Sequence, residues 1–348
     1  MTQFHSNINT ASEEFQRNRA DMLESIDTLR EILDRAATLS DKALPRFQRR
    51  GQLLPRERLS RVLDPGMPFL EIANMAGFLV DDPNRETAVP GCNIICGIGY
   101  ISGVRCMLMV DDSGINAGAM TALSARKGIR AMEIARRKKL PFVHLVESAG
   151  ANLLEYKVEM WLEGGTIFAS LARLSAAGVP TFVVLHGASA AGGAYMPGMS
   201  DYVIGVKGNG KAYLAGPALL KAATGEEADD EELGGAEMHS RVSGLVEYLA
   251  EDDAHGLAIA RELMQTLDWN RLCPQLPPAE FTEPVYDIDE LAGIVPKDYR
   301  QPYDVREVVA RIVDGSDFLD FKPSYGSATV CIQARVYGCL LYTSPSPR

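Results

Sequence analysis

The apolar residues at the start of the chain repeat at the spacing of a helix. In residues 11–38 they recur at intervals of three, four and eight, and acidic and basic residues fill the positions between them. This pattern places the apolar side chains on one face and predicts a long amphipathic helix. The positions that carry it are Phe15, Leu23, Ile26, Leu29 and Leu33.

Further along, short apolar runs alternate with helical patterns. The runs 92–101 and 104–111 are joined by Ser102 and Gly103, a link that predicts a β-hairpin. After the hairpin, we predict helices at 121–139 and 167–177 and from Gly192 onward, and strands at 140–147, 181–185, 202–206 and 211–214. Strands separated by helices of this length need crossover connections, so the sequence predicts an α/β domain with a covered sheet.

Changes in composition predict where this domain ends. Prolines are concentrated in residues 272–284, which favours a linker. We therefore expect a main domain at 11–271 and a proline-rich linker at 272–301. The beginning of a second domain is expected at 302–340 and a non-native tail at 341–348. The second domain is expected to hold a helix at 305–313 and a strand at 329–336, and the acidic run 226–232 is interpreted as a solvated loop.

The overall composition narrows the class of protein. The chain has 348 residues, 46% of them hydrophobic and 23% charged, and its net charge of −11 disfavours nucleic acid as a partner. No apolar run approaches the roughly 18 residues that cross a bilayer, and the first residues lack the apolar centre of a signal peptide, so we expect a cytoplasmic protein without membrane contact. The six cysteines lack zinc-site spacing, so we expect buried thiols and no metal.

Two of the predicted strands end in runs of small residues. Residues 148–151 read Ser-Ala-Gly-Ala, and residues 187–194 contain only Gly, Ala and Ser. Ligands of α/β sheets bind at the carboxyl ends of strands, where such turns expose backbone N–H groups. Two turns side by side would direct two N–H donors at one oxygen and form an oxyanion hole, in which each donor contributes about 2.7–4 kcal/mol.

Two other interpretations of these runs stay open on the residues alone. Gly and Ala also allow a helix to pack closely on a strand without any chemistry. Residues 187–191 read Gly-Ala-Ser-Ala-Ala, which nearly fits the nucleophile motif G-x-S-x-G of hydrolases, although Ala191 replaces its last glycine. That chemistry also needs a histidine and an acid, and His186, His239 and His255 are the histidines that could serve.

Six segments, in their order and spacing, resemble the carboxyltransferase subunit of biotin-dependent acyl-CoA carboxylases. The segments are GQLLPRERLSRVLDPGMPFLEI (51–72), GIGYISGVRCMLMVDDSG (97–114), LVESAGA (145–151), RLSAAGVPTFVVLHGASAAGGAYMPGMSDYVI (173–204), LAGPALLKAATGEE (214–227) and LGGAEMHSRVSG (233–244). The resemblance implies a crotonase-like α/β fold, a ββα superhelix with an N-terminal helix, built as two homologous halves. Residues 303–330 resemble the opening of the second half, so the biotin-site residues are expected beyond residue 340.

The resemblance implies transfer of a carboxyl group from carboxybiotin to an acyl-CoA thioester through an enolate. The catalytic groups are then the N–H groups of Gly192 and Gly193, and no side-chain base is needed because the proton goes to biotin itself. Ala149, Gly150 and Ala151 match a substrate-binding motif in which Ala149 replaces a usual glycine. The other implied substrate-binding residues near these turns are Gly118, Ala191, Ala194 and Tyr195.

The three phosphates of CoA need positive charge, and the predicted helix at 121–139 is strongly basic. Its basic residues are Arg126, Lys127, Arg130, Arg136, Arg137, Lys138 and Lys139. Arg126 and Arg130 lie four residues apart on one face and are the preferred phosphate contacts. A solvated helix face without a ligand is the alternative.

The resemblance also implies partners. An alpha subunit carrying biotin carboxylase and the biotin carrier is expected to bind ATP, and the beta subunits are expected to form a homo-oligomer. Residues 147–153, and Asn116 where many members have lysine, favour a branched enoyl-CoA such as 3-methylcrotonoyl- or geranyl-CoA. The alternatives are acetyl- or propionyl-CoA as substrate, an inactive truncated assembly module, and an enoyl-CoA hydratase or thioesterase.

Overall fold

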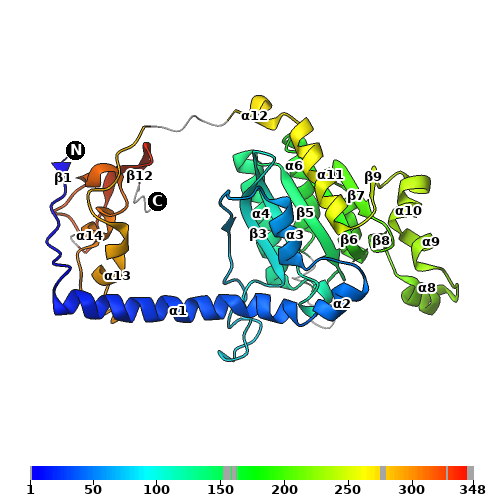
Figure 1. The fold of residues 1–348 in the computed structure, drawn as a ribbon, viewed down its shortest axis with the longest axis horizontal. Helices are drawn as coiled ribbons and strands as arrows, with labels where there is room; N and C mark the ends of the chain where they lie inside the picture. The colour runs from blue at the N-terminus through cyan, green and yellow to red at the C-terminus, as the bar shows by residue number, and fades with distance from the viewer. Residues whose placement is uncertain are drawn as a thin grey trace. The chain divides into compact units, whose positions relative to one another are not determined.

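The computed structural model describes residues 2–151, 158, 162, 164–274, 280–326 and 328–342. The chain divides into two compact units, one formed by Met1–Glu31 with Gln275–Arg348 and the other by Ile32–Pro274 (Figure 1). None of the helices in the described ranges is long and apolar enough to cross a membrane.

The unit Ile32–Pro274 is built on a mixed sheet, which has eight strands within the described residues. In space they follow the order β2-β3-β4-β5-β6-β7-β9, and β8 pairs with the carboxyl end of β6. β2, β3 and β4 are antiparallel, whereas the strands from β4 to β9 pair in parallel. The bounds are β2 (Leu70–Glu71), β3 (Ile94–Ile101), β4 (Val104–Asp111), β5 (Phe142–Ser148), β6 (Thr181–Ala190), β7 (Tyr202–Val206), β8 (Lys211–Tyr213) and β9 (Tyr248–Ala250).

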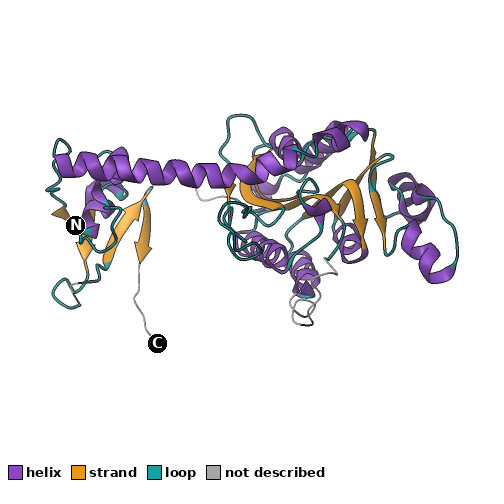
Figure 2. Ribbon diagram, turned by 90° about the horizontal axis from the view of Figure 1, so that it is seen from below, coloured by secondary structure: helices purple, strands orange, loops and turns teal. Residues whose placement is uncertain are grey.

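Helices cover both faces of this sheet (Figure 2). The covering helices are α4 (Ala122–Lys138) and α6 (Thr166–Ala176) on one face, and α3 (Pro55–Val62) and α11 (Asp253–Thr266) on the other. Along β5, Phe142 and Val146 pack toward α4 and α6, while Val143 and Leu145 pack toward α3 and α11. Strands buried on both faces have near-continuous apolar runs, so the predicted covered α/β sheet is confirmed.

The remaining helices are short, apart from the predicted amphipathic helix, which is confirmed as α1 (Glu13–Asp41). The short helices of the larger unit are α2 (Leu44–Arg49), η1 (Asn116–Gly118), η3 (Ala191–Ala194), α7 (Tyr195–Gly198), α8 (Pro217–Thr224), α9 (Asp230–Gly234), α10 (Ala236–Met238), η4 (His239–Ser243) and α12 (Trp269–Leu272). The predicted hairpin is also confirmed, because β3 and β4 pair on either side of Ser102 and Gly103.

Three predictions about this unit need correction. The strand predicted at 181–185 continues to Ala190, because the small residues stay extended and pair with β8. The helix predicted from Gly192 is only the 3₁₀ turn η3 followed by the four-residue α7, so no long helix dipole points at the site. The acidic run 226–232 is not all loop, since Asp229 caps α9 and Asp230 pairs with Lys211.

The cysteines were predicted to be buried, and three of the six are. Cys92, Cys96 and Cys106 are buried, and burial raises the pKa of the Cys92 thiol to about 11 and that of Cys96 to about 12. Cys339 is exposed, and Cys273 and Cys331 are only half-buried. The prediction of buried thiols is therefore wrong for these three, which lie outside the main sheet.

The other unit has a small sheet and core of its own. The sheet follows the order β1-β10-β11-β12, formed by β1 (Thr2–Gln3), β10 (Asp317–Asp320), β11 (Ile332–Val336) and β12 (Cys339–Tyr342). The helices are η5 (Ile288–Glu290), α13 (Leu291–Ile294), α14 (Val305–Val309) and η6 (Asp314–Ser316). The predicted helix 305–313 and strand 329–336 are thus shorter than expected. Leu341 and Tyr342 belong to β12, while the rest of the predicted tail, 343–348, and 275–279 of the predicted linker lie outside the described residues.

Candidate active site

A bulge marks the carboxyl end of β6. Val146 of β5 pairs with Leu185 of β6, but the next pair joins Ser148 to Ser189. Only Glu147 lies between these pairs on β5, whereas His186, Gly187 and Ala188 lie between them on β6. Beyond the bulge, β6 leaves β7 and pairs with β8. Bulges of this kind re-aim a strand next to functional sites.

The bulge brings the two small-residue runs together. Gly150 has a φ of +81°, and a Cβ built on it would lie 3.0 Å from the carbonyl oxygen of Ala190 and 3.7 Å from Cβ of Ala191. A glycine adopts this φ without strain, and its lack of a Cβ lets the two backbone segments approach this closely. The structure therefore places Ala149, Gly150 and Ala151 beside the start of η3, as the paired-turn hypothesis requires.

Gly118 supports the first of these turns. Its φ is +74°, and an added Cβ would lie 2.5 Å from the carbonyl oxygen of Glu147. The Ser148 hydroxyl donates to the Gly118 carbonyl at 3.2 Å and accepts from the Gly150 N–H at 3.2 Å. The Met120 N–H donates to the Gly150 carbonyl at 2.8 Å. These bonds fix the turn after β5 and use the Gly150 N–H, so that group is not a free donor.

The N–H groups at the start of η3 are oriented by an unusual residue. Ala191 has a φ of 50°, a left-handed conformation that is uncommon for alanine. In a 3₁₀ helix each N–H bonds to the carbonyl three residues earlier, so the first two N–H groups, those of Ala191 and Gly192, have no partner within η3.

Side chains beside Gly192 form an aromatic wall. The rings of Phe168 and Tyr195 have centroids 4.7 Å apart. A Cβ added at Gly192 would meet only Phe168, at 3.7 Å, whereas a Cβ at the buried Gly193 would lie 2.9 Å from Oγ of Ser189. Gly192 thus borders open space, and Gly193 lies beneath it. Ala194 and Tyr195 follow directly and are half-buried and exposed, respectively.

Ser189 does not form a hydrolytic triad. Its hydroxyl is fully buried and has no hydrogen-bond partner among the described residues. His186, the histidine nearest in sequence, instead holds Asp253 through Nδ1 at 2.8 Å. A serine nucleophile needs a base within hydrogen-bond reach, so this geometry does not support the hydrolase alternative.

A buried network of charges lies behind the two strand ends, and the sequence reasoning missed it. Arg58 is fully buried and contacts Glu147 at 2.7 Å and Asp253 at 3.0 Å. Burial lowers the pKa of His186 and the Arg58 guanidinium lowers it further, so the imidazole is neutral near pH 7. Burial works to raise the pKa of Asp253, but His186 and Arg58 outweigh it and the pKa is lowered. Arg58 is 89 and 195 residues away from these acids in sequence, so no local pattern signals the network.

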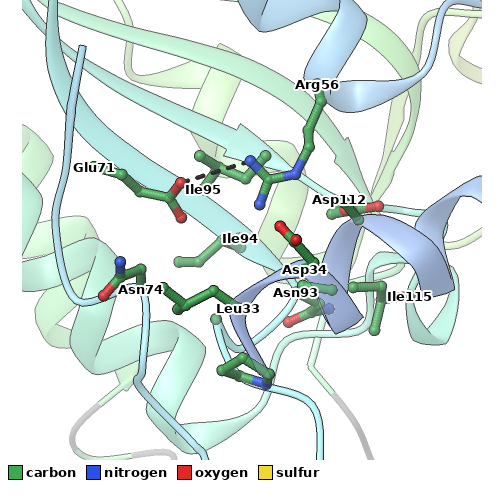
Figure 3. A pocket seen from close by; sticks show the side chains of 14 residues that line it. Leu33, Asp34, Arg56, Glu71, Asn74, Asn93, Ile94, Ile95, Asp112 and Ile115 are labelled. Atoms are coloured by element: carbon green, nitrogen blue, oxygen red, sulfur yellow. Dashed lines mark ion pairs between the residues drawn. The ribbon is translucent and has the colours of Figure 1, made fainter. Parts of the chain in front are cut away.

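The structure also has a polar cavity, of about 270 Å³, that holds none of the predicted site residues (Figure 3). It lies beside β3, where Arg56 pairs with Glu71 at 3.6 Å. Asp112, on its wall, is committed to Ser40 and to the Gly114 N–H. Among the described residues no group of three or more His, Cys, Asp or Glu side chains is placed to hold a metal ion.

Comparison with known proteins shows which family the chain belongs to. The sequence model of a family described as "Carboxyl transferase domain" matches residues 46–341. The chain belongs to the carboxyl transferase domain family. Its sheet, covering helices and paired turns are accordingly those of a crotonase-like fold, and the fold prediction is confirmed.

Individual relatives of this carboxyl transferase domain are longer proteins. It is 48% identical to the probable biotin-dependent acyl-coenzyme A carboxylase beta2 subunit of Mycobacterium tuberculosis, covering 85% of this chain and 54% of that protein. It is 41% identical to the mitochondrial methylcrotonoyl-CoA carboxylase beta chain of Arabidopsis thaliana, and the match covers 95% of this chain and 57% of that protein. The solved beta subunit of P. aeruginosa geranyl-CoA carboxylase superposes with a TM-score of 0.88 and 47% identity. The superposition covers 97% of this chain and 62% of that subunit. The chain therefore spans between 54% and 62% of the length of these relatives.

The basic helix of the carboxyl transferase domain divides into exposed and buried residues. Arg126 and Arg130 are both exposed on α4, and Arg130 forms an ion pair with Glu133 at 2.7 Å. Lys127 is buried instead, and its ammonium group donates to the carbonyls of Gly91 at 3.2 Å and Ile94 at 2.7 Å. Burial lowers the pKa of Lys127. Its inclusion among the phosphate candidates is therefore wrong, because it ties α4 to β3.

We expect Lys127→Met to lower the free energy of unfolding by about 1–3 kcal/mol, because two buried carbonyls lose their donor. Arg136→Met, on the exposed part of the same helix, is expected to change it by less than about 0.5 kcal/mol. Urea denaturation followed by circular dichroism measures both. Equal effects of the two substitutions would contradict the structural role of Lys127.

Proposed function

We propose that this chain is the part of a carboxyltransferase subunit that binds an acyl-CoA thioester and stabilises its enolate. The observation that carries the proposal is the close approach of Gly150 to Ala190 and Ala191 in a member of the carboxyl transferase domain family. Both turns follow neighbouring parallel strands at their carboxyl ends, where α/β sheets bind ligands.

The proposed chemistry needs hydrogen-bond donors at a fixed position. Loss of a proton next to the thioester puts negative charge on its carbonyl oxygen, and backbone N–H groups in a cleft without water stabilise that charge. Gly192 fits this role, since its N–H precedes the first bond of η3 and the space beside it is open. Gly193 is the second proposed donor, and it follows Gly192 directly in η3.

The remaining proposed contacts surround this oxygen. Carboxybiotin would supply the carboxyl group, and no residue of this chain is assigned to hold it. The thioester would lie between the turn at Ala149, Gly150 and Ala151 and the segment from Ala191 to Tyr195, with Gly118 supporting the first turn. Arg126 and Arg130 are the proposed contacts to the CoA phosphates, and Arg130 would exchange Glu133 for a phosphate.

The proposed substrate is a branched enoyl-CoA such as 3-methylcrotonoyl- or geranyl-CoA. The rings of Phe168 and Tyr195, which contact each other at an angle of 45°, offer apolar surface beside Gly192, which suits a branched acyl chain better than an acetyl group. The names of the relatives agree with this choice. The proposed partners are a biotin-bearing alpha subunit that binds ATP and further copies of the beta subunit. The cytoplasmic location and the lack of a metal stay predictions.

A carboxylation assay tests the proposal directly. A version extended to the length of the relatives, mixed with a biotin-bearing alpha subunit, ATP and bicarbonate, is expected to carboxylate 3-methylcrotonoyl- or geranyl-CoA faster than acetyl- or propionyl-CoA. Incorporation of labelled bicarbonate into the thioester measures this. Absence of incorporation with every thioester would contradict the function, and a preference for acetyl-CoA would contradict only the substrate.

Two substitutions at Gly192 distinguish the effect of losing its N–H donor from the effect of adding a side chain. Gly192→Pro removes the donor and is expected to lower kcat by about 10²–10³, the effect of losing one oxyanion-hole donor. Gly192→Ala keeps the donor, and its Cβ meets only Phe168 at 3.7 Å, so kcat should stay within about threefold if the N–H is what matters. Equal losses in the two variants would show that space, not the donor, is required. Gly193→Pro should also abolish transfer, but its ring carbons would crowd Ser189.

Ser189→Ala is expected to leave kcat nearly unchanged, because the hydroxyl lies beneath Gly193 without a base. Removing a buried hydroxyl that has no partner among the described residues should also leave the free energy of unfolding unchanged or raise it, by up to about 1 kcal/mol. Steady-state kinetics and urea denaturation measure the two effects. Loss of activity in a folded variant would restore the hydrolase alternative.

A further inference from the structure

The bulge in β6 is filled by one side chain, that of Glu147. A Cβ built on Gly187, within the bulge, would lie 2.4 Å from Cγ and 2.8 Å from Oε1 of Glu147. The Glu147 side chain therefore lies directly against the Gly187 backbone, where no larger residue fits. Glu147 is also the one residue of β5 between the pairs on either side of the bulge.

Several groups hold the Glu147 carboxylate in this place. Arg58 donates to its Oε2 at 2.7 Å, and the side chains of Arg58 and Glu147 are 0% and 6% exposed. The amide of Gln52 lies 3.5 Å from its Oε1 and donates at 2.7 Å to the carbonyl of His186, inside the bulge. The Glu147 N–H donates to Asp111 of β4 at 3.1 Å. The contacts come from α3, the segment before it and β4, so the position of Glu147 is set by the whole domain.

A second arm of the network holds the other side of the bulge. Arg58 also contacts Asp253, which accepts from the Leu53 N–H at 2.8 Å and contacts Nδ1 of His186 at 2.8 Å. One guanidinium therefore connects β5, through Glu147, with β6, through Asp253 and His186. The exposed Arg50 lies 3.9 Å from Oε1 of Glu147 and is a second, more solvent-screened positive charge near this carboxylate.

We propose that Glu147 and Arg58 are positioning residues that hold the β6 bulge and thereby aim the N–H groups of Gly192 and Gly193, in η3, at the substrate oxygen. The inference rests on the proposed function. Without the bulge, the register Val146 to Leu185 would continue and Ser148 would face Gly187 instead of Ser189. The start of η3 would then lie two residues further along the sheet, away from Gly150.

The test uses the extended beta subunit with its biotin-bearing partner. Glu147→Gln removes the charge that holds Arg58, and Gly187→Ala keeps every charge but forces the carboxylate away from the bulge. Both variants are expected to lower kcat by about 10²-fold, as a displacement of about 1 Å does, while KM for the thioester changes less than about threefold. Amide hydrogen exchange should become faster at residues 187–193 and stay unchanged in β3.

Glu307→Gln is the matched control. Glu307 is 6% exposed on its side chain and pairs with the buried Arg311 at 3.0 Å, outside the unit that holds the site. It should lower stability like Glu147→Gln but leave kcat and the exchange of residues 187–193 unchanged. Equal losses of kcat in this control, or wild-type kcat in both folded bulge variants, would overturn the proposal.

Failure of the proposed function gives a different result. Wild-type protein would then carboxylate no thioester, and hydrogen exchange alone would decide the positioning role. Unchanged exchange at residues 187–193 in Glu147→Gln and Gly187→Ala would overturn it in that case as well.

Discussion

The contact on which the rest of the structure depends is the buried guanidinium of Arg58 between Glu147 and Asp253. Removing such a charge from water costs several kcal/mol, and the cost is recovered only where the partners are close and well oriented. Here the partners come from β5 and from the start of α11, and Arg58 itself lies on α3. Breaking one side of such a pair costs about 3–5 kcal/mol, because a charge is left buried alone. The three elements are thus held in a single arrangement.

Apolar packing alone would not define this arrangement. The two layers of side chains on the faces of the sheet bury β5 throughout and β6 from Thr181 to Gly187, but a shift of one strand by two residues would leave apolar side chains on both faces. The change of register between Val146 and Ser148 is such a shift, fixed at one value. The hydrogen bonds of Glu147, Gln52 and His186 have direction, so they specify the bulge where the apolar core does not.

Local sequence signals predicted most of the elements and marked the two small-residue runs that the structure brings together, but not how these runs are arranged. The spacing of Phe15 to Leu33 gave α1, and the apolar runs gave β3 to β7, because both periods are local properties of the chain. The small residues at 148–151 and 187–194 marked both turns. The length of β6 was missed because its end is set by pairing with β8, and Lys127 was misjudged because its partners, Gly91 and Ile94, lie in another strand region. Periodicity contains no information about contacts of this range.

The need for a fixed register follows from the kind of donor in the proposed site. A side-chain donor can be re-aimed by rotating one bond, whereas a backbone N–H moves only when the chain moves. If the N–H groups of Gly192 and Gly193 face the substrate oxygen, their direction is set by the left-handed φ of Ala191 and by the place where β6 ends. Ala191 adopts that strained conformation next to Gly150, whose lack of a Cβ allows the close approach. A site made from backbone N–H groups would therefore require rigid strands, and on our proposal the buried charges behind the two strand ends supply that rigidity.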